Sequence, residues 1–237
     1  MRKDEVKALL EHAEKDLNKI ETKYNDALRS KDISNELKID IKNFLENLRS
    51  VLDYMANDIY ECKIHPHRTT SGQPDIKNVY FPYGKTLGDF NSGIGRGLPE
   101  LGDIDNDLYL LVESIQPHIT NDSWLYDFCD ITNQKKHDSL TPQERIENNT
   151  TSLGGNIRIG AGARVVMHNC LVNGIPVSSN DVNNEPLENF DSRLNVQRTT
   201  WISFNFSDTN IAVLPFLKKI HSNINSFSDK IYLHLSK

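Results

Sequence analysis

The sequence predicts an α+β protein, with an N-terminal antiparallel helical bundle followed by a small antiparallel sheet that a long C-terminal helix covers. Three observations support this fold class. Apolar residues recur at alternating steps of four and three in residues 4–28 and 37–59, which is the spacing of amphipathic helices. β-branched residues and a hairpin turn follow after residue 152. An apolar stripe with helical spacing returns from about residue 209.

The composition indicates a folded chain that forms one large domain or two small ones. Its 237 residues are 37% hydrophobic and 25% charged, which is enough apolar material for a core. The net charge of −6 argues against a broad basic surface of the kind that coats nucleic acid. The three cysteines are widely spaced and odd in number, so we expect no disulfide framework but small buried side chains in a reducing compartment.

The chain shows no pattern typical of secretion or membrane insertion. Its first residues lack the apolar segment of a signal peptide, and no stretch approaches the 18 apolar residues of a membrane span. We therefore expect a cytoplasmic protein without a membrane partner.

The first two helices are predicted to pair as an antiparallel hairpin, because only a short polar connection separates them. Asp32 or Ser34 can act as N-cap of the second helix. The stripe of the first helix consists of Val6, Leu10, Ala13, Leu17, Ile20, Tyr24 and Ala27. The stripe of the second consists of Leu37, Ile41, Phe44, Leu48, Val51, Met55 and Ile59.

Residues 65–102 break this periodicity with Pro, Gly, Ser and Asn. A loop of this length is uncommon in compact domains and tends to be functional or mobile. Two interpretations stay open: a lid or binding loop, and a set of short helices that the pattern does not reveal.

Two further helices are expected before the composition changes. The first of them carries Leu108 to Ile115 and ends at Pro117, and the second starts at Trp124, is capped within residues 121–123 and ends before Pro142. With the hairpin they would complete a bundle over residues 1–145.

Residues 146–237 are expected to form strands and one helix, packed on the bundle as a single unit. Strands are predicted at 157–159, 164–172 and 197–206 from their β-branched and alternating residues. Asn173-Gly174 is a strong signal for a two-residue hairpin turn. The helix from about residue 209 is the nearest element that could cover the sheet.

The segment from Asn133 to His137 is the main candidate for a functional site. On a helix, Asp130, Asn133, His137 and Leu140 share one face. Histidine can give or take a proton near neutral pH, and an amide or carboxylate beside it can orient its ring. The alternative is a solvated helix end, where Lys135, Lys136 and His137 favour the negative end of the helix dipole.

A second candidate lies on the second helix, where Arg49 and Asp53 are four residues apart and Tyr54 is adjacent. A simple surface ion pair is one interpretation, worth about 0.2–0.5 kcal/mol. The functional interpretation is that Arg49 points into a cleft shared with His137.

Three other motifs are weak. His65, His67 and Arg68 lack the further ligands that a metal site needs. Gly84-Lys85-Thr86 lacks the earlier glycine of a phosphate loop, and no strand precedes the Gly93-x-Gly95-x-Gly97 run as dinucleotide binding requires. We therefore expect no metal and no cofactor.

Two motifs carry a resemblance to known proteins. Leu48-Arg49-Ser50-Val51-Leu52-Asp53-Tyr54 and Asn133-x-x-Lys136-His137-x-x-Leu140 resemble an LRSxLDY…NxxKHxxL pattern of uncharacterised bacterial proteins, and this pattern is similar to the helical HEPN superfamily. Members of that superfamily include RNA-cleaving toxins and defence proteins, whose dimers act without a metal.

The resemblance, over about residues 35–140, implies His137 as the acid and base and Asn133 as its polar companion. Its family arginine, about five residues before the histidine, has no counterpart among residues 130–132, so Lys136 or Arg49 would supply the positive charge. Asp53, Tyr54 and Asp130 would support them. The implied function is an RNA-handling or ribonuclease-type stress or defence protein, with an RNA partner and a homodimer.

Two further functions stay open from the residues themselves. The first is a non-catalytic interaction module whose heptad-like helices pair with a protein partner or with a second copy. The second is small-molecule binding through residues 65–102.

Overall fold

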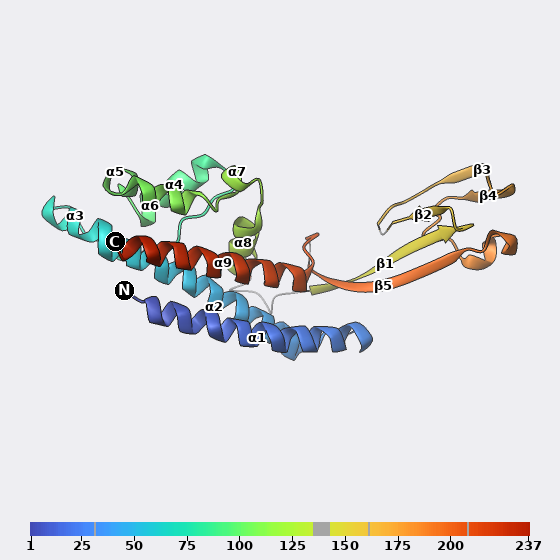
Figure 1. The fold of residues 1–237 in the computed structure, drawn as a ribbon, viewed down its shortest axis with the longest axis horizontal. Helices are drawn as coiled ribbons and strands as arrows, with labels where there is room; N and C mark the ends of the chain where they lie inside the picture. The colour runs from blue at the N-terminus through green and yellow to red at the C-terminus, as the bar shows by residue number, and fades with distance from the viewer. Residues whose placement is uncertain (31, 135–142, 161, 208) are drawn as a thin grey trace. The chain divides into compact units, whose positions relative to one another are not determined.

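The computed structural model describes residues 1–30, 32–134, 143–160, 162–207 and 209–237, and these form two compact units (Figure 1). The helical unit comprises Met1–Gln143 and Phe206–Lys237, and the strand unit comprises Glu144–Asn205. Helices, two small antiparallel sheets and a long C-terminal helix confirm the predicted α+β class.

The helical unit is built on the predicted hairpin of α1 (Lys3–Ser30) and α2 (Asn35–Ile59), which pack along each other. Ser34 is the N-cap of α2, and its side chain accepts a hydrogen bond from the backbone N–H of Leu37 at 3.1 Å. Every residue of the two predicted stripes is buried. The periodicity of the sequence therefore identified the core of this hairpin correctly.

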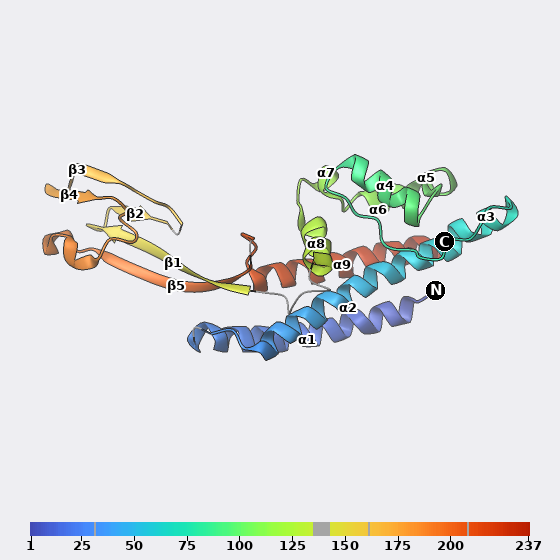
Figure 2. The same cartoon turned by 180° about the vertical axis from the view of Figure 1, so that it is seen from behind.

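The third long helix of this unit is α9 (Val213–Leu235), which runs beside α1 and α2 in both views (Figures 1 and 2). The sequence suggested that this helix covers the sheet, but the structure places it in the helical unit, packed against α1, α2, α6 and α8. The physical reason is that two adjacent amphipathic helices leave an apolar seam, and the stripe of α9 closes it. The ring of Phe227 on α9 also meets the ring of Phe81, from the chain before α4, edge-on at 5.7 Å between centroids.

Residues 65–102 are only partly a loop. A π-helical turn (Tyr60–Ile64) continues α2 into α3 (His65–Thr70), and α4 (Leu87–Gly97) and α5 (Leu101–Ile104) follow. A capping box between Thr86 and Asp89 starts α4. The interpretation as unrecognised short helices is therefore correct for these parts, whereas residues 73–86 are an irregular segment.

Three helices lead to the candidate site: α6 (Asn106–Glu113), α7 (Pro117–Thr120) and α8 (Trp124–Gln134). The first and last of these match the predicted pair. The backbone N–H of Trp124 donates to the Asp122 carboxylate at 3.2 Å, which satisfies one free donor at the start of α8.

The strand unit contains two separate sheets. One has the order β2 (Ile157–Ile159), β1 (Gln143–Leu153) and β5 (Gln197–Phe206). The other pairs β3 (Met167–Val172) with β4 (Ile175–Ser179), and short 3₁₀ turns lie at Leu187–Asn189 and Ser192–Leu194.

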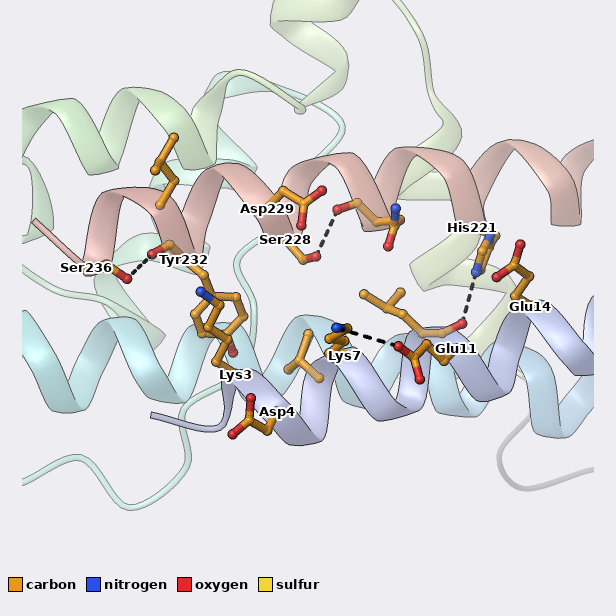
Figure 3. Close-up of a pocket in the computed structure, with 14 residues that line it drawn as sticks. Lys3, Asp4, Lys7, Glu11, Glu14, His221, Ser228, Asp229, Tyr232 and Ser236 are labelled. Atoms are coloured by element: carbon orange, nitrogen blue, oxygen red, sulfur yellow. Dashed lines mark hydrogen bonds and ion pairs between the residues drawn. The ribbon is translucent and has the colours of Figure 1, made fainter.

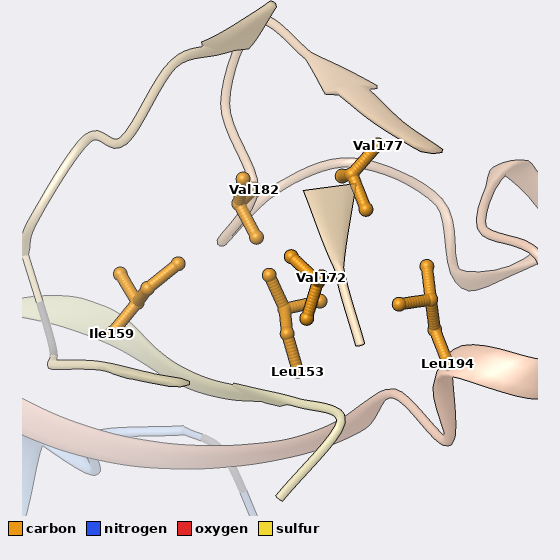
Figure 4. Packing of buried hydrophobic residues seen from close by; sticks show 6 residues of the cluster. All are labelled: Leu153, Ile159, Val172, Val177, Val182 and Leu194. Atoms are coloured by element: carbon orange, nitrogen blue, oxygen red, sulfur yellow. The ribbon is translucent and has the colours of Figure 1, made fainter. Parts of the chain in front are cut away.

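The predicted hairpin turn is present between β3 and β4. Asn173 has φ 53° and Gly174 has φ 78°, the two positive values that a type I′ turn requires. The strand unit has its own small core, shown in Figure 4, made of Leu153, Ile159, Val172, Val177, Val182 and Leu194. This core is independent of α9, which is why the sheet does not need that helix as its cover.

Two sequence expectations concern the whole chain. Cys129 is buried as expected, but Cys62 and Cys170 are exposed, so the expectation was wrong for these two. Within the described residues, no helix has the length and apolar character needed to cross a membrane.

Candidate functional site

A cavity of about 510 Å³ lies in the helical unit, between α2, residues 78–83 of the irregular segment, α4 and the end of α8. Three residues proposed from the sequence, Arg49, Asp53 and Asn133, line it. Its other lining residues are Asn78, Tyr80, Phe81, Pro82, Tyr83, Gly93, Arg96 and Gly97. Two distant motifs of the chain therefore meet at one concave site.

Arg49 lies at the base of this cavity with only 7% of its surface exposed. Its Nη2 atom is 3.3 Å from Asp53 Oδ1, and its Nη1 donates to the Cys129 sulfur at 2.7 Å. The guanidinium also lies over the ring of Tyr83, 5.2 Å from the centroid. Arg49 thus joins α2, α8 and the irregular segment, which is more than a surface ion pair does.

The protonation states at this point follow from burial. Burial raises the pKa of the Cys129 thiol to about 12, although Arg49 opposes the shift, so the thiol is neutral at physiological pH. Burial disfavours the charged form of Arg49, but the interactions with Cys129 and Asp53 outweigh it and the pKa is raised. Arg49 therefore keeps its positive charge beside a neutral sulfur.

Tyr83 connects Arg49 to Asn133. The Asn133 amide donates to the Tyr83 hydroxyl oxygen at 2.7 Å. Burial raises the pKa of Tyr83, so the phenol keeps its proton. Because its oxygen already accepts a hydrogen bond from Asn133, its own O–H is directed elsewhere and can donate to a ligand in the cavity.

Side chains, and not a neighbouring strand, form the hydrogen bonds that fix the irregular segment. Asp53 accepts a hydrogen bond from the backbone N–H of Phe81 at 3.0 Å, and the Asn57 amide donates to the carbonyl of Val79 at 3.2 Å. Gln116, which is fully buried, donates to the Pro82 carbonyl at 3.1 Å. These bonds satisfy backbone groups that would otherwise be unpaired, so the segment has a defined position.

The glycines of α4 allow this segment to lie directly on the helix. A Cβ atom at Gly97 would be 2.7 Å from the carbonyl oxygen of Tyr80, and one at Gly93 would be 3.3 Å from Pro82 Cβ. In the sequence, the Gly93-x-Gly95-x-Gly97 run is only a weak dinucleotide motif. In the structure, the outer two of these glycines form the contact face that positions Tyr80.

Two residues that line the cavity, Tyr80 and Arg96, were not predicted from the sequence. Tyr80 is 60% exposed at the cavity, and Arg96 is an exposed residue of α4. Among the described residues, no carboxylate forms an ion pair with Arg96. The available signal was a cluster of aromatic residues, 80–83, and a single arginine within a glycine-rich run.

Four residues proposed from the sequence are not among the described residues that line this cavity. Lys136 and His137 lie outside the described residues. Tyr54 and Asp130 are both half-buried, and neither is among the described residues that line the cavity. The structure therefore places Arg49 and Asn133 at the same cavity, and the position of His137 at that cavity stays a prediction.

A second concavity, of about 780 Å³, lies between α1 and α9 (Figure 3). Its buried floor includes Val6, Leu10 and Tyr232, and its rim carries charged groups of α1. His221 of α9 contacts the Leu10 carbonyl at 3.2 Å across it. Among the described residues that line it there is no arginine, and its tyrosine, Tyr232, donates to the Asp58 carboxylate.

None of the protein-family models, curated proteins or solved structures compared with this chain matches it. Within the described part of the chain, no group of three or more His, Cys, Asp or Glu side chains is placed to hold a metal ion.

Proposed function

We propose that the helical unit is an RNA-handling module of the ribonuclease type, and that it binds the sugar-phosphate chain of RNA at the cavity between α2, α4 and α8. The observation that carries this proposal is the contact of Arg49 and Asn133 with the same tyrosine, Tyr83, in a cavity that also contains Arg96. Guanidinium, phenol and amide groups are the donors that bind phosphate oxygens.

The chemistry proposed for this site does not use a metal. In such cleavage the 2′-hydroxyl attacks the adjacent phosphorus and the 5′-oxygen leaves, so one proton must be removed and another supplied. His137 is the proposed proton carrier, because histidine titrates near neutral pH and follows Asn133 by four residues. Arg96 and Lys136 would stabilise the charge that develops on phosphate, and Arg49, whose charge Asp53 offsets at 3.3 Å, would position Tyr83 beside it.

The test compares RNA binding and RNA cleavage by the purified chain in excess EDTA. We expect cleavage by the wild-type protein, a loss of at least about 100-fold in His137→Ala, and RNA binding retained in that variant. An Arg96→Gln variant should bind RNA more weakly, whereas Arg29→Gln, an exposed arginine of α1, should not. RNA binding without cleavage would restrict the function to binding, and no RNA binding would refute the proposal.

The main alternative, pairing of heptad-like helices with a partner, has less support. The stripes of α1 and α2 are buried within the helical unit, where α9 packs on both. These apolar faces are therefore occupied by the chain's own helices. An interaction module would have to use another surface.

One observation favours a second copy of this chain at the groove between α1 and α9. Along that groove α1 presents Lys3, Asp4 and Lys7, followed by Glu11 and Glu14, with Lys7 3.9 Å from Glu11, and Leu233 of α9 is 69% exposed beside them. A second α1 in antiparallel orientation would place each pair of lysines opposite a pair of glutamates, as a two-fold interface requires.

Charge reversal tests this second candidate. A variant with Lys3→Glu and Lys7→Glu, and another with Glu11→Lys and Glu14→Lys, should each be monomeric by light scattering. Mixing the two should restore a dimer, because the reversed charges are then complementary. A wild-type chain that is monomeric at high concentration would refute it.

A further inference from the structure

We propose that the same cavity is a single-nucleotide subsite, in which Tyr80 stacks on a base while Arg96 and the Tyr83 hydroxyl bind the attached phosphate. This inference names the substrate unit of the site and rests on the proposed function for its biological role. The ligand chemistry is that of a nucleoside monophosphate, present either as a free nucleotide or as the terminal unit of an RNA strand.

The phosphate side follows from the charges and donors at the cavity. Arg49 is paired with Asp53 at 3.3 Å, so these two groups largely cancel. Arg96 forms no ion pair with the described carboxylates, and its charge is the net charge of the described residues that line the cavity. The Tyr83 O–H adds a donor that Asn133 orients at 2.7 Å. A compact anion with several acceptor oxygens matches this arrangement.

The base side follows from Tyr80. Tyr80 is 60% exposed, so much of its ring makes no apolar contact with the protein and is available to a ligand. Its backbone is held against α4, because Gly97 permits an approach that a Cβ atom at 2.7 Å would block. The ring therefore extends from a fixed anchor at the cavity, which lowers the entropy cost of stacking a base on it.

The size of the cavity sets the unit that fits. A volume of about 510 Å³ is that of a small-molecule site, and it accommodates one nucleotide but not a base-paired helix. Stacking also requires a base with a free face, as in single strands and strand ends. The subsite should therefore select unpaired nucleotides.

Titration calorimetry of the full chain with adenosine 5′-monophosphate, adenosine and ribose 5-phosphate tests the inference. The monophosphate should bind more tightly than either fragment. Tyr80→Leu should weaken its binding about 5- to 150-fold, while Tyr80→Phe, which keeps the ring, should change it less than about 3-fold. Arg96→Gln should weaken binding of the monophosphate and leave binding of adenosine unchanged. Arg29→Gln, outside the cavity, should bind both ligands as the wild type does.

The outcomes separate this inference from the proposed function. RNA binding without any monophosphate binding, or equal binding by Tyr80→Leu and wild type, would overturn the subsite and leave the RNA proposal standing. Monophosphate binding without RNA binding would support the subsite and refute the RNA proposal. Competition by a 5′-phosphorylated single strand, but not by its duplex, would identify the RNA end as the source of the nucleotide.

Discussion

The glycines of α4 offer the sharpest test of how the cavity is built. Replacing Gly93, Gly95 and Gly97 one at a time by alanine adds the same methyl group at three positions of one helix. At Gly95 nothing lies within 4 Å of the new atom, at Gly93 the nearest atom is a side-chain carbon at 3.3 Å, and at Gly97 it is the Tyr80 carbonyl oxygen at 2.7 Å.

The expected energies follow from these distances. In an exposed helix interior, Gly→Ala stabilises by about 0.5–1 kcal/mol, which applies directly to Gly95. At Gly97 the contact is too short and involves backbone, so α4 or the segment at Tyr80 must shift, at a cost of about 1–3 kcal/mol. The Gly93→Ala substitution should change the free energy of unfolding by an amount between these two values. The free energy of unfolding should therefore rank Gly95→Ala above wild type and Gly97→Ala below it.

Urea unfolding followed by circular dichroism measures the series, with Gly95→Ala as the matched control. Gly97→Ala should also weaken monophosphate binding, because the shift displaces Tyr80 from the cavity. If Gly97→Ala proves as stable as Gly95→Ala and binds the same ligand equally, α4 does not support the segment as described. Equal destabilisation at all three positions would instead mean that the helix tolerates no side chain on any face.

Three further predictions concern other parts of the chain. Tyr232→Phe removes the hydroxyl that donates to the buried Asp58 at 2.9 Å, and should lower the free energy of unfolding in urea by about 1.5–3 kcal/mol. Burial alone would raise the pKa of Asp105, but hydrogen bonds from His234 and Lys63 outweigh it and lower this pKa to about 2. The free energy of unfolding should therefore fall by about 1–2 kcal/mol between pH 3.8 and pH 2, as the carboxylate is protonated. Asp105→Asn should abolish this contribution to the pH dependence. Gly174→Val, at φ 78°, should speed amide hydrogen exchange in the β3–β4 hairpin, whereas Gly160→Val, which is in open space without a positive φ, should not.

The sequence was most informative where local pattern and tertiary packing agree. The stripes of α1 and α2 and the Asn173-Gly174 turn were predicted correctly, because each is fixed by short-range periodicity or by a backbone requirement. The partner of α9 could not be predicted. An amphipathic stripe shows that a helix is covered but not by which elements, and here α9 packs against α1 and α2.

For a related reason, only some of the residues that line the cavity could be predicted from the sequence. Arg49 and Asn133 are on helices whose faces can be read from spacing, and both line the cavity. Tyr80, Tyr83 and Arg96 are in or beside an irregular segment held by hydrogen bonds from Asp53 and other distant side chains. Such bonds have no sequence period, so no pattern could have indicated which way these residues face.

The two arginines of the cavity differ in what a substitution would reveal. Arg49 contacts Cys129, Asp53 and Tyr83 together, so its removal leaves the half-buried Asp53 carboxylate without its ion pair and the Tyr83 ring without its cation contact. A loss of binding in an Arg49 variant would therefore mix structural and ligand effects. Arg96 is exposed and has no ion pair among the described residues, so its charge is available at little structural cost. The salt dependence of binding should consequently decrease in Arg96→Gln, and this variant, rather than one at Arg49, decides whether the cavity binds an anion.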